Sequence, residues 1–170
     1  MDTNEKRDII DNLQAGRQTL MHALHGITEE DAHRKPNAGS WSVLECMEHI
    51  AIAEEYMFGL ITSASMIEHP LVNKGREALI RKRGSDRSRK VEAPDIAKPG
   101  GRFCSLNDAT QHFLASRRRT VEFVETCNTD LRAMLTTHPV AGQVNCYEML
   151  LIISAHPIRH AGQIVELRNL

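Results

Sequence analysis

The chain has 170 residues, of which 41% are hydrophobic, and its formal net charge at pH 7 is −1. A chain of this length buries enough apolar surface to stay folded without disulfides, so we expect a single domain over residues 1–170. The balanced charge argues against a chain-wide surface for nucleic acid or anionic membranes. No apolar run approaches the roughly 20 residues that span a bilayer. We therefore expect neither a nucleic-acid partner nor a membrane partner.

The start of the chain and its cysteines indicate the compartment. The first ten residues, MDTNEKRDII, are charged and lack the apolar core of a secretory signal. The four cysteines lie far apart and form no CxxC pair, which is typical of reduced thiols. Both features predict a cytoplasmic protein.

Apolar residues recur at helical spacing in four stretches, and the first covers residues 4–25. Gly26 follows it, where a helix-terminating glycine belongs. The second stretch begins after Ser42, which forms a capping-box pattern with Glu45, and continues to about residue 62. It is apolar on more than one face, which predicts a helix deep in a bundle.

Residues 65–104 interrupt this pattern, because prolines and glycines break any long regular element there. A short helix over residues 75–83 is compatible with the sequence. Residues 74–102 contain ten Lys or Arg and four Asp or Glu, a local charge of +6. We interpret this segment as a solvated, mobile loop. The alternative is a basic lid over an anionic ligand.

The third helical stretch covers about residues 105–128, and the fourth begins near Asn145 and continues to the end of the chain. Three consecutive arginines at positions 117–119 spread over about 200° of a helix, so we expect a solvated face rather than one basic patch. Pro157 lies inside the fourth stretch and predicts a kink there. No strand-like alternation competes with these helices.

His156 and His160 are the sharpest chemical feature. Residues four apart lie on one helix face with Cβ atoms about 5–6 Å apart, which lets two imidazoles reach one metal ion. The alternative is two polar side chains hydrogen-bonded in a helix groove. The stretch before His156 is largely apolar, and burying unpaired imidazoles costs roughly 1–3 kcal/mol each. A shared metal ion would satisfy both rings.

A third ligand has to come from another helix, and His49 is the best candidate. It lies between Met47 and Ile50 in the mostly apolar second stretch. The alternative interpretation of His49, if it stood alone, is a single buried histidine that is hydrogen-bonded to a carbonyl. The long 65–104 connection can cross the bundle, so that the second and third helices run parallel.

Two segments resemble the DinB/YfiT-like family: GSWSVLECMEHIAIAEE, and HPVAGQVNCYEMLLIISAHPIRHAGQI near the end of the chain. The resemblance covers nearly the whole chain. It implies an all-α fold, an up-down-down-up four-helix bundle with a long connection between the second and third helices, often dimeric. It also implies that His49, His156 and His160 are the three metal-binding histidines.

Three imidazoles leave open positions on an ion for water or substrate, as in catalytic sites. We expect one divalent transition-metal ion, Zn or Ni before others, although nitrogen ligands also suit Cu and Fe. Relatives of the family include thiol transferases and metal-dependent hydrolases. We expect an enzyme that joins a low-molecular-weight thiol to an electrophilic small molecule. The alternatives are hydrolysis by metal-activated water and a non-catalytic stress-response or binding bundle.

Supporting residues follow from helical spacing. Gln163 shares the face of His156 and His160 and could orient a ligand ring, or bond to a neighbouring helix. Glu45 lies four residues before His49 and could act as a base or acceptor, but its capping role already explains it. For three further residues near the second helix we favour packing roles over chemical ones: Trp41, Cys46 and Tyr56.

Overall fold

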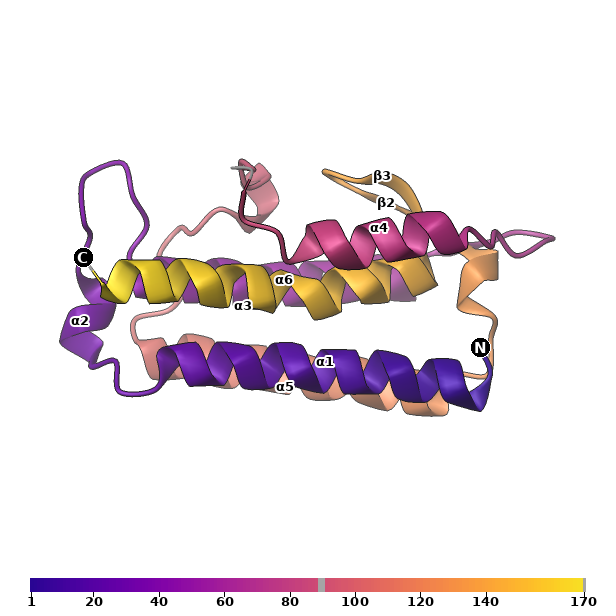
Figure 1. Cartoon of the computed structure of the whole chain (residues 1–170), viewed down its shortest axis with the longest axis horizontal. Coiled ribbons are helices and arrows are strands. Elements are labelled where there is room, and N and C mark those ends of the chain that lie inside the picture. Colours follow the sequence, from indigo (N-terminus) through magenta and orange to yellow (C-terminus); the bar gives the residue numbers. More distant parts are fainter. Residues whose placement is uncertain (89–90, 170) are drawn as a thin grey trace.

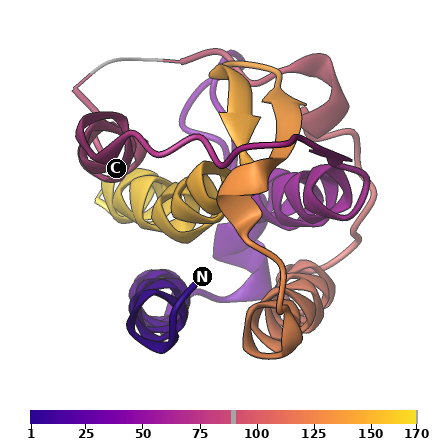
Figure 2. The same ribbon diagram turned by 90° about the vertical axis from the view of Figure 1, so that its right-hand side faces the viewer.

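Four long helices form the body of the protein. The computed structural model describes residues 1–88 and 91–169. The long helices are α1 (Thr3–Leu24), α3 (Val43–Thr62), α5 (Leu106–Thr126) and α6 (Cys146–Arg168). In Figure 1, α1 and α6 run in one direction, whereas α3 and α5 run in the other. Viewed end-on in Figure 2, the helices occupy the corners of a bundle in which α1 packs on α6 and α3 packs on α5. The expected up-down-down-up topology is confirmed.

The helix starts predicted from the sequence are formed by capping side chains. Ser42 accepts a hydrogen bond from the backbone N–H of Glu45, whose carboxylate accepts the N–H of Ser42 in return. The same reciprocal box stands at the start of α6, between Asn145 and Glu148. Each box satisfies two of the N–H groups that a helix N-terminus leaves without partners.

A small sheet and several short helices complete the fold. The antiparallel sheet has the order β1-β2-β3, and the sequence did not predict it, although the all-α four-helix bundle stands. These strands are too short for side-chain alternation to stand out in the sequence. The short elements are β1 (Ser65–Met66), β2 (Met134–His138), β3 (Gly142–Asn145), α2 (Glu29–His33), α4 (Lys74–Gly84), η1 (Asp95–Ala97) and η2 (Leu131–Ala133).

The core consists of two apolar clusters with a buried ion pair at the middle of the bundle. The guanidinium of Arg117 binds both carboxylate oxygens of Glu54, at 2.6 and 2.8 Å, and also donates to the carbonyls of Leu13 and Ile153. Arg117 is 2% exposed, so the prediction of a solvated arginine face was wrong at this position. Among the described residues, no helix has the length and apolarity needed to cross a bilayer.

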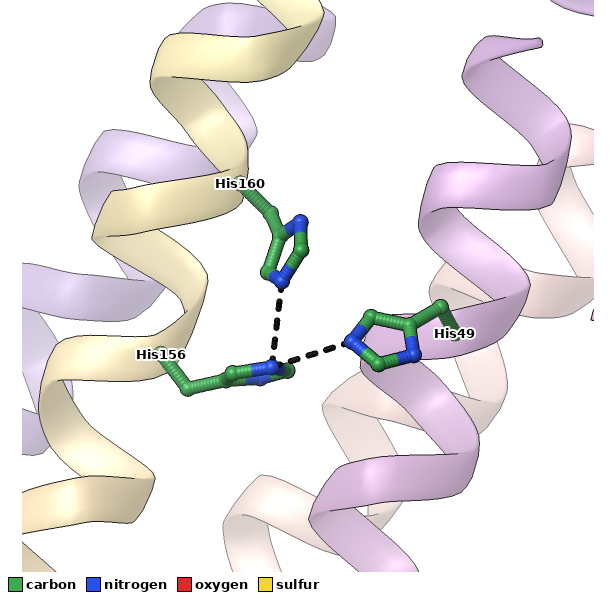
Figure 3. Close-up of side chains that lie close together, drawn as sticks. All are labelled: His49, His156 and His160. Atoms are coloured by element: carbon green, nitrogen blue, oxygen red, sulfur yellow. Dashed lines mark hydrogen bonds between the residues drawn. The ribbon is translucent and has the colours of Figure 1, made fainter. Parts of the chain in front are cut away.

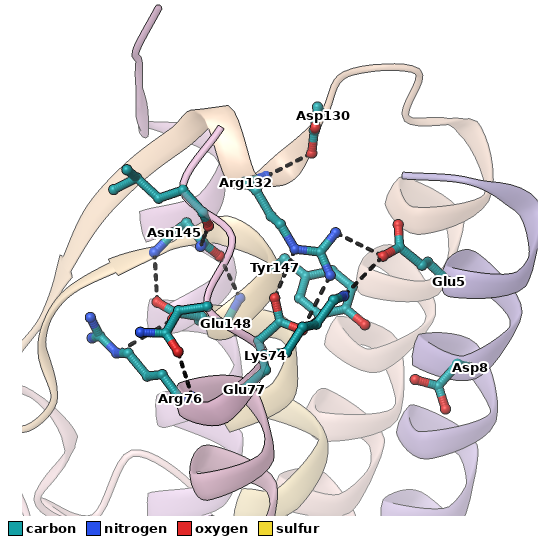
Figure 4. Close-up of polar contacts among 12 residues, drawn as sticks. Glu5, Asp8, Lys74, Arg76, Glu77, Asp130, Arg132, Asn145, Tyr147 and Glu148 are labelled. Atoms are coloured by element: carbon teal, nitrogen blue, oxygen red, sulfur yellow. Dashed lines mark hydrogen bonds and ion pairs between the residues drawn. The ribbon is translucent and has the colours of Figure 1, made fainter. Parts of the chain in front are cut away.

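The basic segment 74–102 is partly helical and largely ion-paired. Residues 74–84 form α4, which packs along α6, rather than the solvated loop that we expected. Figure 4 shows how α4 is tied to the bundle: Glu77 binds the buried Arg132, which also pairs with Glu5. Arg89 and Lys90 lie outside the described residues. Several other bases of this segment pair with acids, namely Lys74 with Glu5 and Glu77, Arg81 with Asp8, Arg87 with Glu166, Lys98 with Asp95, and Arg102 with Glu55.

Candidate metal centre

Three histidines converge where the start of α3 faces the second half of α6. Because these helices run antiparallel, His49 lies opposite His156 and His160 (Figure 3). The Nε2 atom of His156 lies 3.1 Å from the Nε2 of His49 and 3.1 Å from the Nε2 of His160. All three nitrogens lie within 4.8 Å of one another, and this is the one group able to hold a metal ion among the described residues. The structure therefore brings together the three residues that the sequence selected.

The outer nitrogens of two rings are held by hydrogen bonds. Nδ1 of His49 lies 2.6 Å from the carbonyl oxygen of Ala97, which can only accept, so this nitrogen carries the proton. Nδ1 of His160 lies 2.9 Å from Oε1 of Gln163. Arg87, which can only donate, also points at that Oε1, so the amide oxygen faces His160. In both rings the lone pair is therefore on Nε2, at the centre of the cluster.

This proton arrangement fits a cation better than a metal-free cluster. His49 and His160 both present an Nε2 lone pair to Nε2 of His156, which can offer at most one proton to one of them. A metal ion bound by all three lone pairs removes that conflict. Tetrahedral geometry with Zn–N distances of roughly 2.0–2.1 Å requires N···N separations of about 3.3 Å, close to the 3.1 Å that separates Nε2 of His156 from Nε2 of each of the other two histidines. The residues present therefore fit the ion that the family resemblance implies.

Burial keeps the three imidazoles neutral. Desolvation lowers the pKa of His49 below its usual value of 6.5 and lowers that of His160 to about 3. Burial and the neighbouring rings hold the pKa of His156 well below 6.5. Metal binding requires neutral imidazoles, so the cluster is in the correct protonation state at pH 7.

The remaining residues singled out from the sequence have other environments. The carboxylate of Glu45 accepts the N–H of Ser42 and binds Lys35 at 2.6 Å, so its capping role is the one observed. Burial raises the pKa of the Cys46 thiol to about 12, which fits a small apolar side chain. Tyr56 is half-buried two turns beyond His49 on α3.

The contact of Trp41 with His49 and the hydrogen-bond acceptor of His49 were not predicted from the sequence. We expected only a packing role for Trp41, but its ring lies 5.1 Å from that of the metal-site residue His49, centroid to centroid. The acceptor is the backbone carbonyl of Ala97, and backbone carbonyls leave no trace in a sequence. Glu48 was also overlooked, although a carboxylate beside His49 in a mostly apolar helix was a readable signal.

Comparisons with known proteins agree with this architecture. The uncharacterized protein YuaE of Bacillus subtilis (strain 168) is 21% identical over 156 residues, covering 90% of this chain and 93% of YuaE. YfiT from Bacillus subtilis, described as a probable metal-dependent hydrolase with an unusual four-helix bundle topology, superposes with a TM-score of 0.61 at 16% identity, over 99% of this chain and 89% of YfiT. The four-helix bundle protein TT2238 gives 0.59 at 16% identity, over 93% of this chain and 96% of its own.

The family comparison identifies the superfamily of this chain. The sequence model of the DinB superfamily matches residues 12–164, which include all three histidines of the cluster and Gln163. This chain therefore belongs to the DinB superfamily.

Proposed function

We propose that this protein is a metal-dependent enzyme that holds one divalent transition-metal ion, Zn or Ni before others, with His49, His156 and His160. The observation that carries the proposal is the convergence of three Nε2 atoms, two of them on rings whose Nδ1 is already hydrogen-bonded. Three protein ligands leave a coordination position open, which is typical of catalytic rather than structural sites. Gln163 orients the ring of His160.

The chain's own residues determine how a substrate reaches this site. His49 and His160 are 5% and 7% exposed, whereas His156 is only half-buried. A small molecule therefore approaches on the side of His156, while Trp41 and the 95–97 segment cover the side of His49. When bound, the ion lowers the pKa of a coordinated thiol or water and so supplies a nucleophile at neutral pH.

We propose a low-molecular-weight thiol as the first candidate for that nucleophile, with an electrophilic small molecule as its acceptor. The resemblance to a family that includes thiol transferases supports this choice. Hydrolysis is the second candidate, supported by the likeness to YfiT and its description as a probable metal-dependent hydrolase.

Turnover assays on untagged protein, loaded with Zn or Ni, test the proposal and separate its two forms. The protein is incubated with a chromogenic alkyl halide and, separately, with an activated ester, each with and without cellular thiols. Thiol-dependent loss of the halide that disappears in His156→Ala supports the transferase, and ester cleavage in water alone with the same dependence supports the hydrolase. His22→Ala, an exposed histidine on α1, serves as the control and keeps full activity.

Metal-independent turnover, or no turnover with either substrate class, contradicts an enzymatic role for the site. In the second case, retained folding without metal favours the non-catalytic binding bundle.

A further inference from the structure

A buried carboxylate beside the metal centre binds the chain that leads into α5. Glu48 is 1% exposed, and its oxygens accept the backbone N–H groups of Gly100, Gly101 and Arg102 at 2.8, 3.2 and 2.9 Å. Hydrogen bonds from several N–H groups to one ionised carboxylate are among the strong hydrogen bonds of proteins. Glu48 therefore fixes the position of the backbone at residues 100–102.

The local sequence is suited to this contact. Gly101 has a φ of +81°, a conformation that side chains with a Cβ rarely adopt. It lets three successive N–H groups turn toward one carboxylate. A residue other than glycine at this position would strain the turn, so the contact depends on both Glu48 and Gly101.

The same stretch of chain supplies the hydrogen-bond acceptor of a metal-site histidine. Ala97 lies three residues before Gly100, in η1, and its carbonyl accepts the Nδ1 proton of His49 at 2.6 Å. Glu48 and His49 are consecutive residues of α3, so both ends of the 95–102 segment are anchored to one turn of one helix.

We propose that Glu48 is a positioning residue of the metal centre, which acts on His49 through the 95–102 segment. The segment holds His49 in the tautomer that points its Nε2 lone pair inward, and metal binding in turn stabilises the docked segment. The inference rests on the proposed metal site. Because linkage is reciprocal, docking and metal binding strengthen each other by the same factor.

Metal affinity of variants at two glutamates of α3 tests the first half of the proposal. Glu48→Gln replaces one acceptor oxygen by an NH₂ group that faces backbone N–H groups. We expect it to weaken Zn binding by about 10–100-fold in a chelator competition, the usual effect of losing a group that orients a ligand. Glu55→Gln is the matched control, because among the described residues Glu55 binds side chains rather than backbone, namely those of Arg102 in the same loop, at 2.8 Å, and of His112. It should change the affinity by less than about twofold.

Hydrogen exchange tests the reverse direction. In the wild type, Zn should slow exchange of the Gly100, Gly101 and Arg102 amides, and His156→Ala should abolish this protection. If Glu48→Gln fails to fold, Gly101→Ala replaces it. In the described part of the chain, apart from the two adjoining residues, nothing lies within 4 Å of the added Cβ, so the change strains only the turn. It should weaken Zn binding severalfold.

The outcomes separate this inference from the proposed function. The positioning role would be overturned if Glu48→Gln, or Gly101→Ala where it replaces that variant, binds Zn as tightly as the wild type while the amides of residues 100–102 in the same variant exchange fast. Such a result would leave the metal site itself intact. A wild-type protein that binds no divalent metal would overturn both proposals.

Discussion

The chemistry of the site depends on single hydrogen bonds at the outer nitrogens of its rings. Gln163 is held from the far side by Arg87, which also binds both carboxylate oxygens of Glu166 at 2.9 and 2.6 Å. This chain of contacts fixes the amide so that its oxygen accepts the Nδ1 proton of His160. The lone pair of Nε2 is thereby directed at the other two histidines.

Substitution of Gln163 tests this orienting contact. Gln163→Leu removes the acceptor and should weaken Zn binding by about 10–100-fold. Gln163→Glu keeps an oxygen for both His160 and Arg87 and should retain most of the affinity. Chelator competition on the two folded variants provides the measurement. Equal affinities would mean that the amide oxygen has no influence on the ring.

The buried pair of Arg117 and Glu54 makes a prediction about stability. Arg117→Met leaves the Glu54 carboxylate buried without its partner and should lower the free energy of unfolding by roughly 3–5 kcal/mol. The double variant Arg117→Met/Glu54→Leu should recover much of that loss. Arg81→Met, which breaks the partly exposed pair with Asp8, should cost less than about 1 kcal/mol. Denaturant unfolding measures all three, and a double variant no more stable than the single one would contradict the account.

At the scale of elements, α1 and α6 approach each other closely at Gly16. A Cβ there would lie 2.5 Å from the backbone oxygen of Ser154 and 3.1 Å from Cγ of Pro157. Pro157 has no N–H for the carbonyl of Ile153, and Arg117 donates to that carbonyl instead, at 3.2 Å. The helix therefore passes through Pro157 unbroken, because a side chain from α5 replaces the missing bond.

Two glycine substitutions test this close approach. Gly16→Ala should destabilise the protein by about 2 kcal/mol or more, because the clash is with backbone and requires the two helices to separate. Gly59→Ala in α3 meets nothing within 4 Å, and it should stabilise the protein by roughly 0.5–1 kcal/mol through helix propensity. Thermal unfolding measures the change in stability of the two variants. Similar changes at both sites would contradict the close contact at Gly16.

The four long helices were predictable because their signals are local. Capping residues such as Ser42 and Asn145 and the apolar spacing act within one helix, and the observed starts match them. The strands and α4 were harder, because β2 has five residues and α4 is mostly polar. Both are held by tertiary contacts. The strands are held by pairing with one another, and α4 is held by ion pairs with α1 and η2.

The candidate site was predictable only in its side chains. His49, His156 and His160 were selected from spacing and apolar surroundings, and the structure gathers them. The contribution of the 95–102 segment was not predictable, since it consists of the Ala97 carbonyl and of backbone N–H groups. Arg117 was misjudged because the sequence does not show which member of the arginine triplet faces inward. In the structure Arg117 is buried, whereas Arg118 and Arg119 are exposed.

At the scale of the whole molecule, the neutral histidines link stability to pH. With metal removed by a chelator, the ring of His160 stays neutral in the folded protein at pH 5, whereas in the unfolded chain its pKa is near 6.5 and it is protonated. The unfolded state then binds more protons, so stability falls as pH drops below about 6.5. For His160, whose folded pKa is about 3, the loss between pH 7.5 and 5 should be roughly 2 kcal/mol.

Urea unfolding of the metal-free protein at the two pH values measures this loss. His160→Gln should show a pH dependence smaller by about that amount, and the exposed control His22→Gln should match the wild type. A variant at 160 with an unchanged pH dependence would show that this histidine is not held neutral.

The central claim is that three histidines from two helices bind one ion, and metal content tests it most directly. Untagged protein dialysed against Zn or Ni should retain close to one ion per chain. His49→Ala, His156→Ala and His160→Ala should each lose it while remaining folded, and His22→Ala should keep it. Unchanged metal content in all three folded variants would contradict the claim.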